Sequence, residues 1–329
     1  MRIVVLAGGV GGSRFTTGVR AAYPDAEITA IVNTADDITL HGLRICPDLD
    51  TMMYALGGGN DVERGWGRSG ETWQVLDELR TYGVEPLWFA LGDRDIATHL
   101  VRTQLMNAGY PLSEVTAALC SRWLAHDPRL RLLPMSDDRV ETHVLIPAPD
   151  EPSGRRAVHF QEYWVRLHAE PPALAVIQVG IEDSTPAAGV LDALAAADLV
   201  LLAPSNPVVS IGPILAVPGL RSALLAGPAP VIGFSGILAG APVLGMAHRL
   251  LPAIGVEVQA GAVGRHYGHR AAGGLLDLWV VDSADAPGAV SATAGAREGD
   301  DLQTLATPLL MSSPEATARF VRAAVGALP

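Results

Sequence analysis

The chain has 329 residues, 49% of them hydrophobic and 18% charged, a composition that supports a large core and argues against disorder. Its formal net charge of −12 argues against nucleic acid and anionic membranes as partners, because such contacts need basic patches. All 23 basic residues are arginine, so a lysine Schiff base is excluded and any phosphate must be held by arginine, backbone N–H groups or a metal ion.

The first thirty-four residues predict a strand, a glycine-rich turn, a helix and a second strand. Residues 3–7 and 28–32 are continuous apolar runs, typical of strands buried on both faces of a parallel sheet. Ser13 is expected to cap the intervening helix, which ends near Tyr23. Such a βαβ unit places its turn where nucleotides bind in open α/β sheets.

Apolar runs and helical patterns alternate along much of the remaining chain. Buried strands are predicted at 87–91, 175–179, 199–203, 231–234 and 278–281, and helices at 94–106, 113–124, 187–197, 242–251 and 314–327. This alternation predicts an α/β fold with a Rossmann-like, doubly wound, mostly parallel sheet.

One stretch interrupts the alternation. Residues 112–170 contain a helix and then strand-like segments at 141–146 and 159–164, joined by a turn-rich connection. We expect 112–170 to form a smaller inserted α+β lobe that covers the site, and 1–111 with 171–329 to form the nucleotide-binding core.

The turn after the first strand contains Gly8, Gly9, Gly11, Gly12 and Ser13. Glycines let the backbone approach a phosphate, and the following helix offers free N–H groups. Arg14 stands where a dinucleotide fingerprint has its third glycine, Asn33 stands where it has an acidic residue, and a P-loop would need a lysine. The turn therefore predicts a phosphate or nucleotide site, and its alternative is a merely tight turn.

Acidic residues follow at two places. Asp36 and Asp37 lie just beyond the second strand, at an end that faces the ligand crevice, where they can hold a ribose or a base edge or serve as a helix cap. Asp48 and Asp50 have one residue between them, and in an extended segment both carboxylates point the same way and reach one hard cation. Mg²⁺ in such a place neutralises a diphosphate, while one carboxylate can instead orient an attacking hydroxyl. Paired acids on a solvated loop are the alternative, which the apolar neighbours disfavour.

Two later segments also carry polar groups at predicted strand ends. In the segment 92–99, Arg94 is a candidate bidentate clamp for phosphate or carboxylate. Asp93 is equally suited to capping a helix. The segment 203–213 supplies small hydroxyls, an amide and backbone donors that can hold a base or phosphate.

Taken together, these segments resemble the 2-phospho-lactate transferases of coenzyme F420 biosynthesis and their actinobacterial phosphoenolpyruvate transferase branch, the CofD/FbiA family. The matching stretches are the glycine turn and residues 32–37, 47–51, 91–99, 133–138, 159–161 and 204–213. Each motif is weak alone, but they occur in family order across nearly the whole chain.

The resemblance implies that the ribityl hydroxyl of a deazaflavin, Fo, attacks a guanosine diphosphate ester of lactate or enolpyruvate and releases GMP. It implies Mg²⁺ and a homodimer. Asp48 and Asp50 would be the catalytic and metal-binding carboxylates, and the acceptor Fo would contact Asp50, Arg94, Asp95 and His99. The nucleotide would be held by Gly8, Gly9, Gly11, Gly12, Ser13, Asn33, Asp36, Asp37, Ser205, Asn206, Ser210 and Gly212.

Two other functions are compatible with a glycine turn. A distantly similar bacterial family binds UDP-sugars without catalysis, and the Asp48/Asp50 pair favours the transferase over it. A nicotinamide dehydrogenase is disfavoured by Arg14 and Asn33. Neither the donor's organic acid nor the choice of metal-binding aspartate follows from the sequence.

The sequence predicts a cytoplasmic protein. Cys46 and Cys120 form no CxxC or Cys/His cluster, as expected in a reducing compartment. The N-terminal apolar run is too short for a signal peptide, and Asp192 and Asp198 interrupt the apolar stretch 190–203. We therefore expect small-molecule substrates and no membrane or nucleic-acid partner.

Overall fold

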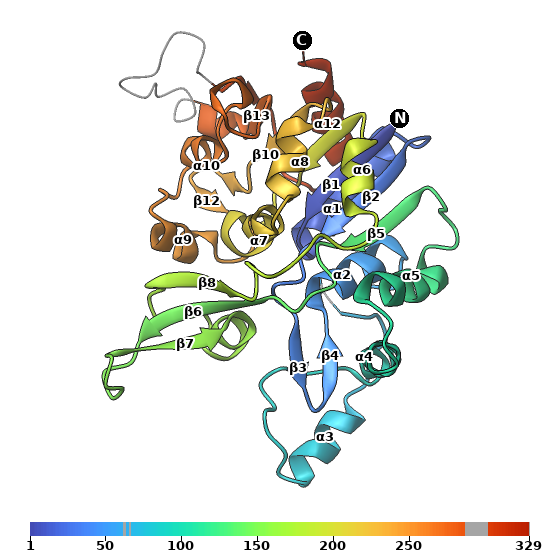
Figure 1. Ribbon diagram of the computed structural model, residues 1–329, viewed down its shortest axis with the longest axis vertical. Coiled ribbons are helices and arrows are strands. Elements are labelled where there is room, and N and C mark those ends of the chain that lie inside the picture. The colour runs from blue at the N-terminus through green and yellow to red at the C-terminus, as the bar shows by residue number, and fades with distance from the viewer. Residues whose placement is uncertain (62–63, 66, 287–301, 329) are drawn as a thin grey trace.

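The computed structural model describes residues 1–61, 64–65, 67–286 and 302–328. Its centre is a seven-stranded parallel sheet in the order β14-β13-β10-β9-β1-β2-β5 (Figure 1). In chain order its strands are β1 (Arg2–Ala7), β2 (Glu27–Val32), β5 (Leu130–Pro134), β9 (Leu199–Leu202), β10 (Val231–Phe234), β13 (Leu278–Val281) and β14 (Thr304–Ala306). The predicted α/β class with a doubly wound parallel sheet is confirmed.

The central strands are continuously apolar because both faces of the sheet are covered. In β1, Ile3 and Val5 face one core, and Val4 and Leu6 face the other. The first core contains residues of α1 (Val10–Ala22), α2 (Pro47–Leu56), α5 (Leu112–Trp123) and α12 (Pro314–Gly326). The second contains residues of α6 (Val190–Ala195), α7 (Gly212–Ala216), α8 (Leu220–Ala226), α9 (Ala247–Leu250) and α10 (Ala260–Tyr267).

Smaller elements surround the central sheet. They comprise the hairpins β3 (Ile38–Leu40)/β4 (Leu43–Ile45) and β11 (Ile237–Leu238)/β12 (Ala241–Pro242), and the helices α3 (Gln74–Thr81) and α4 (Asp93–Asn107). They also include a second sheet in the order β7 (Arg155–His159), β6 (Glu141–Pro147), β8 (Ala175–Val179), which is antiparallel and lies to one side of the main sheet (Figure 1). Short π or 3₁₀ turns are η1 (Glu162–Arg166), η2 (Pro207–Ile211), η3 (Leu251–Ile254), η4 (Arg270–Ala272) and η5 (Ser283–Asp285).

Two predicted strands of the main sheet are wrong. Residues 87–91 are irregular, and Leu91 instead packs with the β3–β4 hairpin in a small third core. Residues 175–179 do form a strand, β8, but in the antiparallel sheet, where Ile177 and Val179 are exposed. An apolar run alone does not distinguish a strand of the main sheet from an irregular segment or a strand of another sheet, because it contains no information about the neighbouring strand.

The segment 112–170 does not coincide with the second sheet. Its strand β5 pairs with β2 at the edge of the main sheet, whereas β8 lies beyond residue 170. The strand predicted at 159–164 is also misplaced: β7 ends at His159, and η1 follows. The division into a core and an acceptor-covering lobe stays a prediction.

Most predicted helices are found with boundaries shifted by a residue or two, as in α4, α5 and α12. Two are shorter than expected. The prediction at 187–197 corresponds to α6 alone, and that at 242–251 contains only α9 and the start of η3. Within the described ranges, no single helix is long and apolar enough to cross a membrane; the bent pair 207–216 and 220–226, 79° apart, meets that test only when counted together.

Candidate phosphate-binding and acidic site

The carboxyl ends of β1, β2 and β9 meet where the direction of the sheet reverses. The chain passes from β1 to β2 on one side and later returns through β9 on the other side of β1. Ligands of open α/β sheets bind outside such a switch point. The glycine turn, Asn33 and Ser205 each follow one of these three strands.

The glycine turn is held close to three polar side chains. The backbone N–H of Gly8 donates to Ser205 Oγ at 3.1 Å. A Cβ on Gly8 would lie 2.5 Å from Ser210 Oγ, and a Cβ on Gly9 would lie 2.6 Å from Asp48 Oδ1. Glycine is therefore required at both positions, and the predicted residues of three separate segments do come together.

The predicted cap at Ser13 is wrong. Helix α1 begins earlier, at Val10, and the buried Ser13 donates to the carbonyl of Val10 at 3.0 Å. No side chain caps the start of α1, so its first N–H groups keep their capacity to bind an anion. Gly12 serves packing, since its Cβ would lie 2.7 Å from Ala7 Cβ.

In the segment after β9, some residues contact the glycine turn and others hold the loop in shape. Asn206 Oδ1 accepts from the N–H groups of Val208 at 2.9 Å and Val209 at 3.3 Å, so it caps η2. A Cβ on Gly212 would lie 2.8 Å from the carbonyl oxygen of Pro207. Asn206 and Gly212 thus shape the loop that presents Ser205 and Ser210 to the glycine turn.

Asp48 and Asp50 do not lie in an extended segment, so that expectation is wrong. They occupy the first turn of α2, which begins at Pro47, a favoured first residue of a helix. Residues two apart on a helix point in nearly opposite directions. Asp48 turns toward the glycine turn, and Asp50 turns into the interior.

Half-buried Asp48 and buried Asp36 form an acidic pair, which we call the acidic pocket. Asp48 Oδ2 accepts from Asn33 Nδ2 at 2.9 Å. Burial raises the pKa of Asp48 to about 6, and the Asn33 bond and the Gly9 N–H only partly offset this. Burial and then the charge of Asp48 hold the pKa of Asp36 well above its usual range, and Asp36 Oδ1 has no hydrogen-bond partner.

Asp37 borders this pocket but has an arginine partner. Its carboxylate pairs with Arg44 at 3.0 Å, and burial raises its pKa to about 6 despite that guanidinium. The adjacent carboxylates predicted to hold a base edge are therefore both buried, and the charge of Asp37 helps to raise the pKa of both Asp36 and Asp48.

Asp50 is paired with a residue absent from the expected set, Arg102. Arg102 Nη1 donates to Asp50 Oδ2 at 3.0 Å, and its Nη2 donates to Asp50 Oδ1. His99 lies beside them, with Nδ1 3.1 Å from Arg102 Nη1 and Nε2 3.4 Å from Asp95 Oδ2. Asp50, His99 and Arg102 are all buried, whereas Asp95 is partly exposed.

Asp50, Asp95 and His99 offer ligand atoms within 4.8 Å of one another, a spacing compatible with a metal ion. The Arg102 guanidinium already neutralises Asp50, and a divalent cation beside it would meet repulsion between like charges. Asp36 and Asp48 have no such cation against them, and their hard oxygens suit Mg²⁺. The acidic pocket is the better cation site of the two.

Arg94 is exposed at the start of α4. Its Nη1 donates to the carbonyl of Ser69 at 3.1 Å, and Glu71 accepts from the backbone N–H groups of Arg94 and Asp95 at 2.8 and 2.9 Å. Asp93 caps α3 by accepting from the N–H groups of residues 74 and 75. The predicted acceptor contacts thus differ in solvent exposure: Arg94 is exposed, Asp95 is partly exposed and His99 is buried.

Sequence reasoning missed Arg102, Tyr54 and Glu71. Tyr54 donates to Asp95 Oδ1 at 2.6 Å and so forms a second link between α2 and α4. Residues 95, 99 and 102 follow the spacing of one helical face, so Arg102 could have been found from the predicted helix. Glu71 has no local signal.

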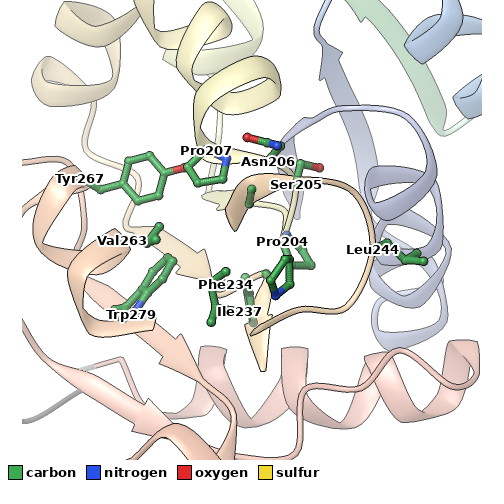
Figure 2. Close-up of a pocket in the computed structure, with 13 residues that line it drawn as sticks. Pro204, Ser205, Asn206, Pro207, Phe234, Ile237, Leu244, Val263, Tyr267 and Trp279 are labelled. Carbon is green, nitrogen blue, oxygen red and sulfur yellow. The ribbon is translucent and has the colours of Figure 1, made fainter. Parts of the chain in front are cut away.

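A pocket of about 380 Å³ adjoins Ser205 and Asn206 (Figure 2). Its walls include Phe234, Trp279 and Tyr267, and the Tyr267 hydroxyl points toward Pro207 (Figure 2). Polar and apolar groups both line this recess, which lies beside the segment whose Ser205 contacts the glycine turn.

Comparisons with known proteins agree with this geometry. A family model described as 2-phospho-L-lactate transferase CofD matches residues 3–305. A phosphoenolpyruvate transferase of Kitasatospora aureofaciens is 59% identical over 326 residues, covering 99% of this chain and 97% of that protein. Another, of Nocardia farcinica, is 55% identical over 327 residues, covering 98% and 94%.

A solved structure shows the same fold at low sequence identity. Protein BH3568 of Bacillus halodurans has a TM-score of 0.60 and 17% identity, covering 98% of this chain and 99% of its own. That likeness concerns the fold alone. On the match along residues 3–305 and the identity to its relatives, the chain belongs to the 2-phospho-L-lactate transferase CofD family.

Proposed function

We propose that this protein transfers a phosphoenolpyruvyl or phospholactyl group from a guanosine diphosphate ester to the ribityl hydroxyl of the deazaflavin Fo. The names of the relatives favour a transferase and, of the two groups, phosphoenolpyruvyl. The observation that carries the proposal is that an uncapped helix start lies beside two carboxylates, those of buried Asp36 and half-buried Asp48. One part suits a diphosphate and the other a cation that neutralises it.

In this reaction the hydroxyl oxygen of Fo forms a bond to the phosphorus that carries the organic acid. The bond from that phosphorus to the bridging oxygen breaks, GMP leaves with the oxygen, and the hydroxyl proton is released. The backbone N–H groups that begin α1 would bind the donor phosphates. Ser205 and Ser210 line the same turn and would add hydroxyl contacts.

The acidic pocket fits Mg²⁺. Asp36 Oδ1 is buried without a partner, and a cation there would supply the positive charge that these two carboxylates lack. Asp48 and Asp36 would hold the ion, whose chemistry is to neutralise the diphosphate charge. Asp48 thus keeps the metal-binding role that the sequence predicts for it, and Asp36 takes the place of Asp50 as the second ligand.

The acceptor would lie toward the α2–α4 side. There Asp50, fixed by Arg102, would orient the hydroxyl, and exposed Arg94 would contact the acceptor or its incoming group. His99 and Asp95 would support Asp50 from within. We further propose a homodimer, which the family resemblance implies, and a cytoplasmic location, which the cysteine pattern and the short N-terminal apolar run favour.

The direct test is to incubate the purified protein with Fo, Mg²⁺ and enolpyruvyl-diphosphoguanosine or its lactyl counterpart, and to measure GMP and the Fo ester by mass spectrometry. We expect both products in equal amounts, formed about 10²-fold or more slowly by the Asp48→Asn variant. Thermal stabilisation by UDP-N-acetylglucosamine, without stabilisation by Fo or GDP, would instead indicate a nucleotide-sugar-binding protein.

A further inference from the structure

A second cavity, of about 490 Å³, lies on the other side of the loop that follows β9. Gly11 and Arg14, three residues apart on α1, line it together with Pro204. Pro204 also lines the pocket of Figure 2, so the two hollows flank the same strand end. Arg14 therefore stands at the wall of a cavity that begins beside the phosphate-binding turn.

The rest of this cavity is mainly apolar. Leu244 comes from the loop after β12, and Leu309 and Met311 come from the segment before α12. Such a surface can cover the nucleoside portion of a ligand whose phosphates lie at the turn. Arg14 is the one charged residue among the cavity's lining residues.

Arg14 has no hydrogen bond or ion pair within the part of the chain that the structure describes. The arginines around the acidic residues are all engaged. Their partners are Asp37 for Arg44, the carbonyl of Arg94 for Arg68, the carbonyl of Ser69 for Arg94, and Asp50 for Arg102. The free guanidinium nearest the turn in sequence is thus Arg14.

We infer that Arg14 binds the diphosphate of the guanosine nucleotide, with the nucleoside lying in the cavity that Arg14 lines. This rests on the proposed function. The chain has no lysine, and the donor's phosphates lie near the carboxylates of Asp36 and Asp48, so a side-chain cation is needed beside Mg²⁺. A guanidinium donates to two phosphate oxygens at once, which the free fork of Arg14 is suited to do.

The test measures the dissociation constants of GDP and of guanosine, each with Mg²⁺, by calorimetry. The proteins are the wild type, Arg14→Met, Arg14→Lys and, as a control, Arg80→Met on the exposed face of α3. We expect Arg14→Met to weaken GDP about 10- to 100-fold and guanosine less than about 2-fold, because the lost contact is to phosphate. Arg14→Lys should recover part of the GDP affinity, and the control should match the wild type.

Three results would overturn the inference, and they are distinguishable. If the wild type binds GDP and Arg14→Met binds it equally well, Arg14 does not hold the diphosphate and the proposed function stands. If the wild type binds neither GDP nor guanosine, the proposed function itself fails and the role of Arg14 fails with it. Equal weakening of GDP and guanosine would also contradict a phosphate contact.

Discussion

Arg102 on α4 donates from both terminal nitrogens to the carboxylate of Asp50 on α2, and both side chains are buried. Burial disfavours the charged guanidinium, but Asp50 and other nearby groups raise the pKa of Arg102 above its usual value. The guanidinium therefore stays charged, and its two bonds to Asp50 hold α2, which carries Asp48 two residues earlier. The position of the acidic pocket depends on this link.

Breaking the pair should be costly. We expect Arg102→Met to lower the free energy of unfolding by about 3–5 kcal/mol, because it leaves the Asp50 charge buried without a partner. Urea denaturation followed by circular dichroism measures this. Arg80→Met, which breaks the exposed pair with Asp77, is the control and should change stability by less than about 1 kcal/mol. A loss below about 1 kcal/mol in Arg102→Met would contradict the role of the pair.

Asp48→Asn should keep the fold and lose activity. Desolvation disfavours the charged form of Asp48 and raises its pKa. Asparagine carries no charge, so the free energy of unfolding should not fall. Turnover should drop by about 10²-fold or more, and stabilisation by Mg²⁺ should disappear. Asp25→Asn, at a side chain that is 98% exposed, is the matched control. Retention of Mg²⁺ stabilisation by Asp48→Asn would remove Asp48 from the metal site.

Asp50→Asn distinguishes orientation from metal binding. We expect turnover to fall by about 10²-fold while stabilisation by Mg²⁺ is retained, since Arg102 and not a metal faces this carboxylate. Steady-state kinetics and thermal shifts with and without Mg²⁺ measure the two effects separately. Unchanged turnover would exclude Asp50 from the mechanism.

The protein should lose stability in mild acid through His159. Its Nε2 lies 3.2 Å from the carbonyl of Asp37, and its Nδ1 accepts from the N–H of Gln161 at 3.1 Å, so the ring is held neutral. Burial lowers the pKa of His159 to about 4 from an unfolded value near 6.5. The unfolded chain then binds more protons between pH 6.5 and 4, and this contribution to stability falls as the pH falls through that range.

Comparison with a His159 variant separates the contribution of His159 from those of nearby carboxyl groups. Asp37 and Asp48 have raised pKa values, so their contribution to the free energy of unfolding rises as the pH falls from about 6 to 4. The pH dependence of the wild type alone therefore does not isolate His159. The free energy of unfolding of wild type minus that of His159→Gln should decrease from pH 7 to pH 4.5. A difference that is independent of pH would contradict the neutral, buried state of His159.

The glycine turn should not accept a methyl group at position 9. Gly9→Ala places a Cβ against Asp48 Oδ1, which must move, and overpacking of this kind costs about 1–3 kcal/mol. We expect weaker GDP binding as well as a lower melting temperature. Gly326→Ala, where a Cβ meets nothing within 4 Å, is the control and should be neutral or slightly stabilising. Equal behaviour of the two variants would contradict the close approach.

The local features of the fold were predictable because they depend on short stretches of chain. The strands β1, β2 and β9 were predicted from their continuous apolar runs, and the turn after β1 was predicted from its glycines. The helical start at Pro47 was also readable, since Leu49, Met52 and Met53 have helical spacing and all are buried. The prediction that Asp48 and Asp50 lie in an extended segment is inconsistent with that spacing.

The remaining differences arise from long-range pairing. Nothing within residues 130–134 indicates that β5 joins β2, or within 175–179 that β8 joins β6, because a strand's partner lies elsewhere in the chain. The proximity of Asp36 and Asp48 likewise depends on how α2 packs against α1, α5 and β5. Sequence motifs identified the participants, and tertiary packing decided which of them meet.

The last helix of the chain packs against the first. Phe15 and Phe320 stack with ring centroids 6.3 Å apart, and Gly18 allows Thr317 to approach so closely that a Cβ would collide with it. The partner of β1 on its other side, β9, begins only at Leu199. During synthesis at 5–20 residues per second, the emerging nucleotide turn waits roughly 15–60 s for α12 to leave the ribosome. The nascent N-terminal segment therefore lacks this cover until translation ends, and a premature stop near the end of the message would leave α1 without its partner α12.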